Sequence, residues 1–140
     1  VCIMHMNGEP GNMQKNPRYR DVVEEVATYL DQQASELIDR GLPKELILID
    51  PGIGFGKTQQ HNILLMKSAK RFQKLGYGLL WGVSRKSVIG HITGKENASE
   101  RLSGTLASSL FGAEMGVDVL RVHDIDEHND LFKVYQALNN

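Results

Sequence analysis

The feature that most constrains the fold of this chain is a regular alternation of short apolar runs with longer amphipathic segments. The runs are continuous and rich in Val, Ile or Leu, as in parallel strands covered on both faces; they span residues 1–4, 46–49, 79–83 and 117–122. Apolar residues spaced three and four apart predict helices over about 22–38, 60–75, 99–115 and 126–138. The alternation predicts an α/β fold of four βα units with a parallel sheet, either open and doubly wound or closed into a barrel.

Length and charge are those of one ordinary domain, and we treat residues 1–140 as a single one. With 41% hydrophobic residues and a net charge of -1, the chain is expected to bind neither nucleic acid nor a membrane surface. A lone cysteine, Cys2, excludes an internal disulfide and favours a cytoplasmic location. Because the chain opens on Val1, directly within an apolar run, we expect a fragment of a larger fold.

A glycine-rich stretch, DPGIGFGKT, occupies residues 50–58 and looks at first like a phosphate-binding loop. It misses both standard templates, because a Walker loop needs glycine at Pro51 and a dinucleotide fingerprint needs glycine at Lys57. A turn between a strand and a helix is the simpler interpretation. Asp50, however, follows a buried strand, where a carboxylate needs an internal cation or a hydrogen-bonding ligand. The alternative is an Asp that merely initiates a turn before proline, and Lys57 has no assigned role.

Each cluster of reactive side chains follows a predicted strand; the clusters span residues 5–14, 50–58, 84–87 and 121–124. Strand ends that converge on one face build the active site of a (β/α)₈ barrel, of which four units are half. The basic run 84–87 is either a solvated turn or a site for an anionic or carbonyl group. Arg121 and His123 lie two apart, which on a strand places them on one side as a candidate phosphate clamp; pairing of Arg121 with Asp124 or Asp126 is the structural alternative.

The first cluster is less informative, since Met4 and His5 are as well explained as core residues. Order and spacing assemble no serine or cysteine nucleophile with a histidine, so covalent catalysis has no support in the sequence.

Taken together, five motifs in this order resemble dihydropteroate synthase. They are MHMxGxPxxMQ at 4–14, DPGIGFGK with His61-Asn62 at 50–62, GxSRKSxIG at 82–90, RLxGTLA at 101–107 and RVHD at 121–124. The resemblance implies a (β/α)₈ TIM barrel of which this chain is the carboxyl-terminal half, about the last four βα units. It also implies a transferase of folate biosynthesis, a sulfonamide target, that condenses p-aminobenzoate with 6-hydroxymethyl-7,8-dihydropterin pyrophosphate and releases pyrophosphate.

The resemblance implies a role for each matching residue. The pterin site would comprise Met4, Asp50, Gly82 and Lys86, with Asp50 on the N–H edge of the ring, Lys86 on its carbonyl side and Gly82 leaving room for the ring. Arg121 and His123 would bind pyrophosphate, and Phe55, Arg85, Lys86 and Ser87 would bind p-aminobenzoate. Asp50, Lys86, Arg121 and His123 are the expected catalytic residues.

The remaining implications concern groups outside these motifs. The resemblance implies Mg²⁺ on the pyrophosphate, with its ligands in the missing amino-terminal half and none in this chain, and a homodimer. Without that half we expect the chain to be inactive and poorly folded, because a half barrel leaves parallel strand edges and apolar surface unpaired. The alternatives are a noncatalytic pterin-binding barrel fragment and a related pterin-dependent methyltransferase, for which the 84–87 run would have no purpose.

Overall fold

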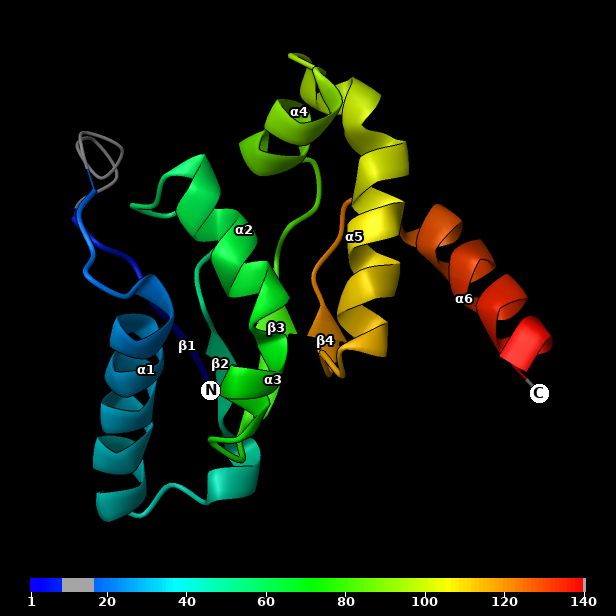
Figure 1. The fold of residues 1–140 in the computed structure, drawn as a ribbon. Coiled ribbons are helices and arrows are strands. Elements are labelled where there is room, and N and C mark those ends of the chain that lie inside the picture. The colour runs from blue at the N-terminus through cyan, green and yellow to red at the C-terminus, as the bar shows by residue number, and fades with distance from the viewer. Residues whose placement is uncertain (9–16, 140) are drawn as a thin grey trace.

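The computed structural model describes residues 1–8 and 17–139 and shows parallel strands with helices packed against them (Figure 1). Its sheet has four strands in the order β1-β2-β3-β4. Their bounds are β1 Cys2–Met4, β2 Leu48–Asp50, β3 Gly78–Trp81 and β4 Val119–Leu120. The α-helices are α1 Val22–Asp39, α2 Gln59–Lys67, α3 Ala69–Gln73, α4 Ser87–Thr93, α5 Leu102–Glu114 and α6 Ile125–Asn139, and short 3₁₀ helices span Lys44–Leu46 and Ala98–Arg101.

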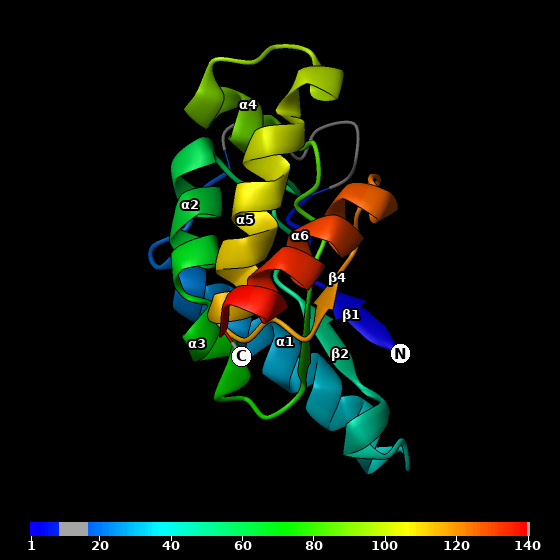
Figure 2. The same cartoon turned by 90° about the vertical axis from the view of Figure 1, so that its right-hand side faces the viewer.

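The register of the sheet aligns the strand ends that carry the predicted site. Met4 lies beside Asp50 across the β1–β2 pair, and Trp81 lies beside Leu120 across the β3–β4 pair. All three pairings are parallel, so the carboxyl ends of the strands meet at one edge of the sheet. In Figure 2, α1, α2 and α5 lie on one side of β1, β2 and β4, as do the outer helices of a barrel. The predicted four βα units of a (β/α)₈ barrel are confirmed.

Helix α1 begins and ends where its sequence specifies. The Asp21 carboxylate accepts hydrogen bonds from the backbone N–H groups of Val23 and Glu24, at 3.0 and 3.1 Å, which caps the first turn. Its apolar stripe is buried; the residues are Val22, Val26, Ala27, Leu30 and Ala34. Gly41, with a φ of 94°, then turns the chain away. The predicted helix over about 22–38 is therefore confirmed.

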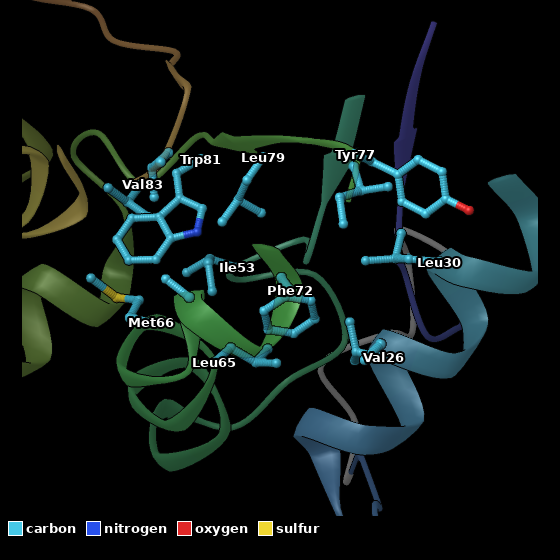
Figure 3. Close-up of a cluster of buried hydrophobic side chains, with 14 of the residues drawn as sticks. Val26, Leu30, Ile53, Leu65, Met66, Phe72, Tyr77, Leu79, Trp81 and Val83 are labelled. Atoms are coloured by element: carbon cyan, nitrogen blue, oxygen red, sulfur yellow. The ribbon is translucent and has the colours of Figure 1, made fainter. Parts of the chain in front are cut away.

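The core lies between the sheet and these helices (Figure 3). Its largest wholly buried side chains are Trp81 on β3 and Phe72 on α3, and Val26 and Leu30 of α1 lie at the Phe72 end of the cluster. Helix α5 passes close to Trp81, because a side chain at Gly112 would place its Cβ 2.9 Å from the indole ring. The core thus fixes β3, whose end carries part of the site.

Several predicted elements differ in detail, including β2, which begins at Leu48 after a 3₁₀ turn, and α5, whose helix begins only at Leu102. The helix predicted over 60–75 is two helices, because the chain leaves helical geometry at Ser68, which has φ −98° and ψ 20°. No helix was predicted directly after the 84–87 run, but α4 begins at Ser87, and its seven residues are too few to show a helical period. The strand predicted over 117–122 is confined to Val119–Leu120.

Candidate active site

A cavity of about 320 Å³ lies where β3 and β4 end. It is lined by residues from the loops after these two strands: Gly82, Ser84, Lys86, Arg121, Val122 and His123. Four of these were predicted as site residues, and the sheet register brings them together. A larger hollow, of about 710 Å³ beside Arg18, Tyr19 and His61, is lined by none of the predicted residues.

Asp50 ends β2, is 4% exposed and interacts electrostatically with the cavity residues Lys86 and Arg121. One carboxylate oxygen accepts a hydrogen bond from the Gly52 backbone N–H at 2.8 Å. Burial raises the pKa of Asp50, while the Gly52 N–H and then Lys86, Arg121 and Lys57 act to lower it. Asp50 is therefore a buried hydrogen-bond acceptor in a group of cations. Half-buried Met4 lies next to it in the sheet.

Lys86 connects the β3 loop to the glycine-rich loop after β2. Its amine donates to the Ile53 carbonyl oxygen and lies 4.3 Å from the centre of the Phe55 ring, a cation–π distance. Burial lowers the pKa of Lys86 to about 8, Asp50 opposes the shift and Arg121 adds to it. Gly54 provides room for the lysine, since an added Cβ would lie 3.2 Å from its Cδ. Phe55 and Lys86, both predicted site residues, are thus in contact.

Arg121 and His123 face the same cavity, as predicted. The cause is not that residues two apart on a strand point to one side, as the prediction assumed. Strand β4 ends at Leu120, so the alternation of side chains along a strand does not apply to them. Arg121 lies against Gly82, where an added Cβ would come within 2.9 Å of its Nη2. The space beside Gly82, expected to accommodate a ligand ring, is thus bordered by a guanidinium.

His123 is oriented by Ser84, a buried residue that sequence reasoning did not single out for this role. The Ser84 hydroxyl oxygen accepts from the His123 backbone N–H at 3.3 Å and lies 2.9 Å from Nδ1 of the ring. When the Ser84 hydroxyl donates its hydrogen to Nδ1, a neutral ring carries its proton on Nε2. In that tautomer the Nε2–H is available to a ligand.

Arg85 and Ser87 lie on either side of Lys86 and differ in their surroundings. Arg85 has a φ of 57°, and its guanidinium pairs with Asp124 through Nη2 and through Nε at 3.0 Å. That pairing lowers the pKa of Asp124 and raises that of Arg85. An arginine therefore does pair with Asp124, but it is Arg85 and not Arg121. Exposed Ser87 begins α4.

The glycines after β2 serve mainly to let two loops touch. An added Cβ at Gly52 would overlap the carbonyl group of His5, and one at Gly56 would overlap that of Asn7. Lys57, which had no predicted role, is 2% exposed and lies between the same loops. The sequence places Lys57 in a glycine-rich loop. It does not indicate its partner, His5, which lies 52 residues away.

The described residues do not fit a magnesium site of their own. Within residues 1–8 and 17–139, no group of three or more His, Cys, Asp or Glu side chains could hold a metal ion. The cavity instead carries lysine and arginine, which suit an anion. Any Mg²⁺ that accompanies such an anion would need ligands from elsewhere.

Parallel βα units with a cationic cavity at the strand ends, beside a buried carboxylate, have the arrangement of the ligand-binding face of an α/β-barrel enzyme. The family model described as "Pterin binding enzyme" matches residues 1–123. The chain therefore belongs to the pterin-binding enzyme family.

Relatives and solved structures agree with this assignment. A dihydropteroate synthase from Neisseria meningitidis serogroup C is 48% identical over 139 residues, which are 99% of this chain and 49% of that protein. The crystal structure of the Stenotrophomonas maltophilia dihydropteroate synthase with bound imidazole superimposes with a TM-score of 0.94 at 42% identity, covering 99% of this chain and 52% of that one. The Thermus thermophilus enzyme in complex with 4-aminobenzoate gives 0.92 at 39% identity, covering 99% and 56%. The chain thus spans about half the length of the relatives it matches.

Proposed function

We propose that this chain supplies the carboxyl-terminal half of a dihydropteroate synthase, which condenses p-aminobenzoate with 6-hydroxymethyl-7,8-dihydropterin pyrophosphate. The observation that carries the proposal is the cavity that joins Lys86, Arg121 and His123 beside the buried Asp50. Its charges suit a substrate with a pyrophosphate at one end and a hydrogen-bonding heterocycle at the other. The likeness to a structure in complex with 4-aminobenzoate supports the second substrate.

In this proposal Asp50 and Lys86 bind opposite edges of the pterin, and Met4 borders the ring. The carboxylate accepts from the N–H groups of the heterocycle, and the ammonium donates to its carbonyl oxygen. Because Lys86 also lies on the Phe55 ring, it can contact both substrates. Gly82 borders the pterin as well, at a point where its missing side chain leaves room for the Arg121 guanidinium.

Arg121 and His123 bind the pyrophosphate that leaves. The aniline nitrogen of p-aminobenzoate forms a bond to the pterin methylene carbon while the bond from that carbon to the pyrophosphate oxygen breaks, and the nitrogen then loses a proton. Negative charge grows on the departing oxygen, where the Arg121 guanidinium and the Nε2–H of His123 stabilise it. The substrate amine is the nucleophile, so no side chain needs to be one.

The carboxylate of p-aminobenzoate would be received at the start of α4. Exposed Ser87 offers a hydroxyl there, and its neighbour Arg85 adds positive charge. Since both Nε and Nη2 of Arg85 already bind Asp124, we assign Ser87 the direct contact and Arg85 the electrostatic one.

The test is formation of dihydropteroate by a complete barrel, made by joining this chain to the amino-terminal half of the Neisseria meningitidis relative. We expect product and pyrophosphate in equal amounts, and none from either half alone. A folded chimera that bound both substrates but formed no product would refute the proposal. Sedimentation of the same chimera tests the homodimer that the resemblance implies.

Location is a separate inference. Every helix within residues 1–8 and 17–139 is too short or too polar to span a membrane. The lone Cys2 is a free, exposed thiol, which suits the reducing cytoplasm, and we infer that location.

A further inference from the structure

Lys57 is buried at the contact between the loops that follow β1 and β2. Its Nζ lies 3.0 Å from Nδ1 of His5, 3.3 Å from the His5 carbonyl oxygen and 2.9 Å from the Phe55 carbonyl oxygen. Two of these acceptors come from one loop and the third from the other. The lysine therefore ties together segments that are 52 residues apart in the sequence.

The number of acceptors matches the number of donors on a charged lysine. A protonated amine carries three N–H bonds and no lone pair, so each N–H can meet one of the three acceptors. His5 must then accept through Nδ1 and carry its proton on Nε2, as a neutral ring. Burial and the nearby Lys57 lower the pKa of His5 to about 4, which agrees with a neutral ring. Burial also lowers the pKa of Lys57 to about 7, and Asp50 opposes that shift.

The surroundings leave this contact little freedom to change. Gly52 and Gly56 bring the backbone of the second loop against the carbonyl groups of His5 and Asn7. The Tyr19 hydroxyl donates to the Gly56 carbonyl oxygen at 2.9 Å, and Asn62 accepts from the Gly54 N–H at 2.8 Å. Lys57 thus belongs to a set of polar side chains that hold the backbone of the second loop.

The same loop carries Phe55, whose ring meets Lys86 at 4.3 Å. We propose that Lys57 is a positioning residue that fixes the Phe55 carbonyl, and through it the Phe55 ring, as one wall of the site for the aromatic amine. This inference rests on the proposed function. In this inference Lys57 does not contact the substrate directly but acts through Phe55.

The test compares Lys57→Met with the exposed lysine variant Lys67→Met in the complete barrel. Methionine keeps the length of the side chain but donates no hydrogen bond. We expect the KM for p-aminobenzoate to rise about tenfold or more, as for a buried acceptor left unpaired, with less than twofold change in kcat and in the KM for the pterin substrate. Lys67→Met should match the parent in all three.

A double-mutant cycle with Phe55→Leu separates positioning from a general structural role. If Lys57 acts through the ring, Lys57→Met should raise the KM little further once Phe55 is leucine. Additive effects, or equal rises in KM for both substrates, would overturn the inference. Should Lys57→Met fail to fold, Lys57→Gln, which keeps a donor, replaces it; loss of folding in both variants would show that the residue is structural and also overturn the inference.

The activity of the parent barrel distinguishes the two proposals. A folded parent that forms no dihydropteroate refutes the proposed function and the role of Lys57 with it. An active parent whose Lys57→Met variant behaves like Lys67→Met refutes only the role of Lys57.

Discussion

Substitution of Gly52 by alanine tests how closely the glycine-rich loop packs on the loop after β1. Gly52 has a φ of 68°, and an alanine held in the left-handed region costs about 1–2 kcal/mol. Its Cβ would lie 3.0 Å from the His5 carbonyl carbon, with the carbonyl oxygen closer still. Carbon atoms prefer about 3.5–4.0 Å, so the contact with the carbonyl carbon alone requires a separation of about 0.5 Å, and the closer carbonyl oxygen requires the loops to move further apart. Overpacking of this kind adds about 1–3 kcal/mol, for a total loss of about 2–5 kcal/mol.

Gly41→Ala is the matched control. Gly41 also has a positive φ, 94°, but no atom lies within 4 Å of its added Cβ. This variant should lose only the backbone cost, about 1–2 kcal/mol. The difference between the two variants therefore isolates the clash with His5.

The assay is urea unfolding of the complete barrel, compared by midpoint and slope. Because the Gly52 N–H donates to the Asp50 carboxylate at 2.8 Å, retreat of the loop should also weaken binding of the pterin substrate, which Gly41→Ala should leave unchanged. Equal losses of stability in the two variants would show that the loops are not in contact at Gly52. If Gly52→Ala were destabilised but bound the pterin substrate with unchanged affinity, the position of this loop would have no influence on how Asp50 binds the pterin.

Further predictions concern charge and specificity. Asp50→Asn should weaken binding of the pterin pyrophosphate by about 2 kcal/mol or more, because a buried charged acceptor is lost; calorimetry with unchanged affinity would refute that role. Ser87→Leu should raise the KM for p-aminobenzoate more than that for the pterin substrate, and equal rises would make the turn merely structural. Lys57 has a pKa of about 7 in the folded state against 10.5 ordinarily, so between these values the unfolded chain binds more protons and stability rises with pH. Relative to Lys57→Met, the parent should gain up to about 1.4 kcal/mol per pH unit in that window, and parallel pH profiles would contradict the burial that lowers the pKa of the Lys57 amine.

The sequence predicts the location of a site residue best when that residue lies at the end of a strand. Asp50 is the last residue of β2, and Lys86, Arg121 and His123 follow β3 and β4; parallel pairing alone brings such residues to one edge. The sequence could therefore place these residues together before their distances were known. The resemblance added their roles, which stay predictions for this chain.

Pairings between loops were beyond the sequence. The bond between Arg85 and Asp124 joins residues 39 apart, and nothing in either motif indicates it. The orientation of His123 by Ser84 likewise depends on how two loops lie in space. Each of these pairs joins loops that follow β3 and β4, so their geometry follows from the sheet register and not from local pattern.

The sequence by itself determined the four βα units, the apolar stripes that cover the sheet, and the strand ends that bear reactive side chains. These are local properties, set by residue periodicity and by what a strand end can expose. Only the tertiary structure decided that the glycines at 52 and 56 admit the loop after β1, and that Lys57 connects the two loops. The physical reason is that a buried lysine finds its acceptors in backbone carbonyls and a ring nitrogen, whose positions exist only once the strands have paired.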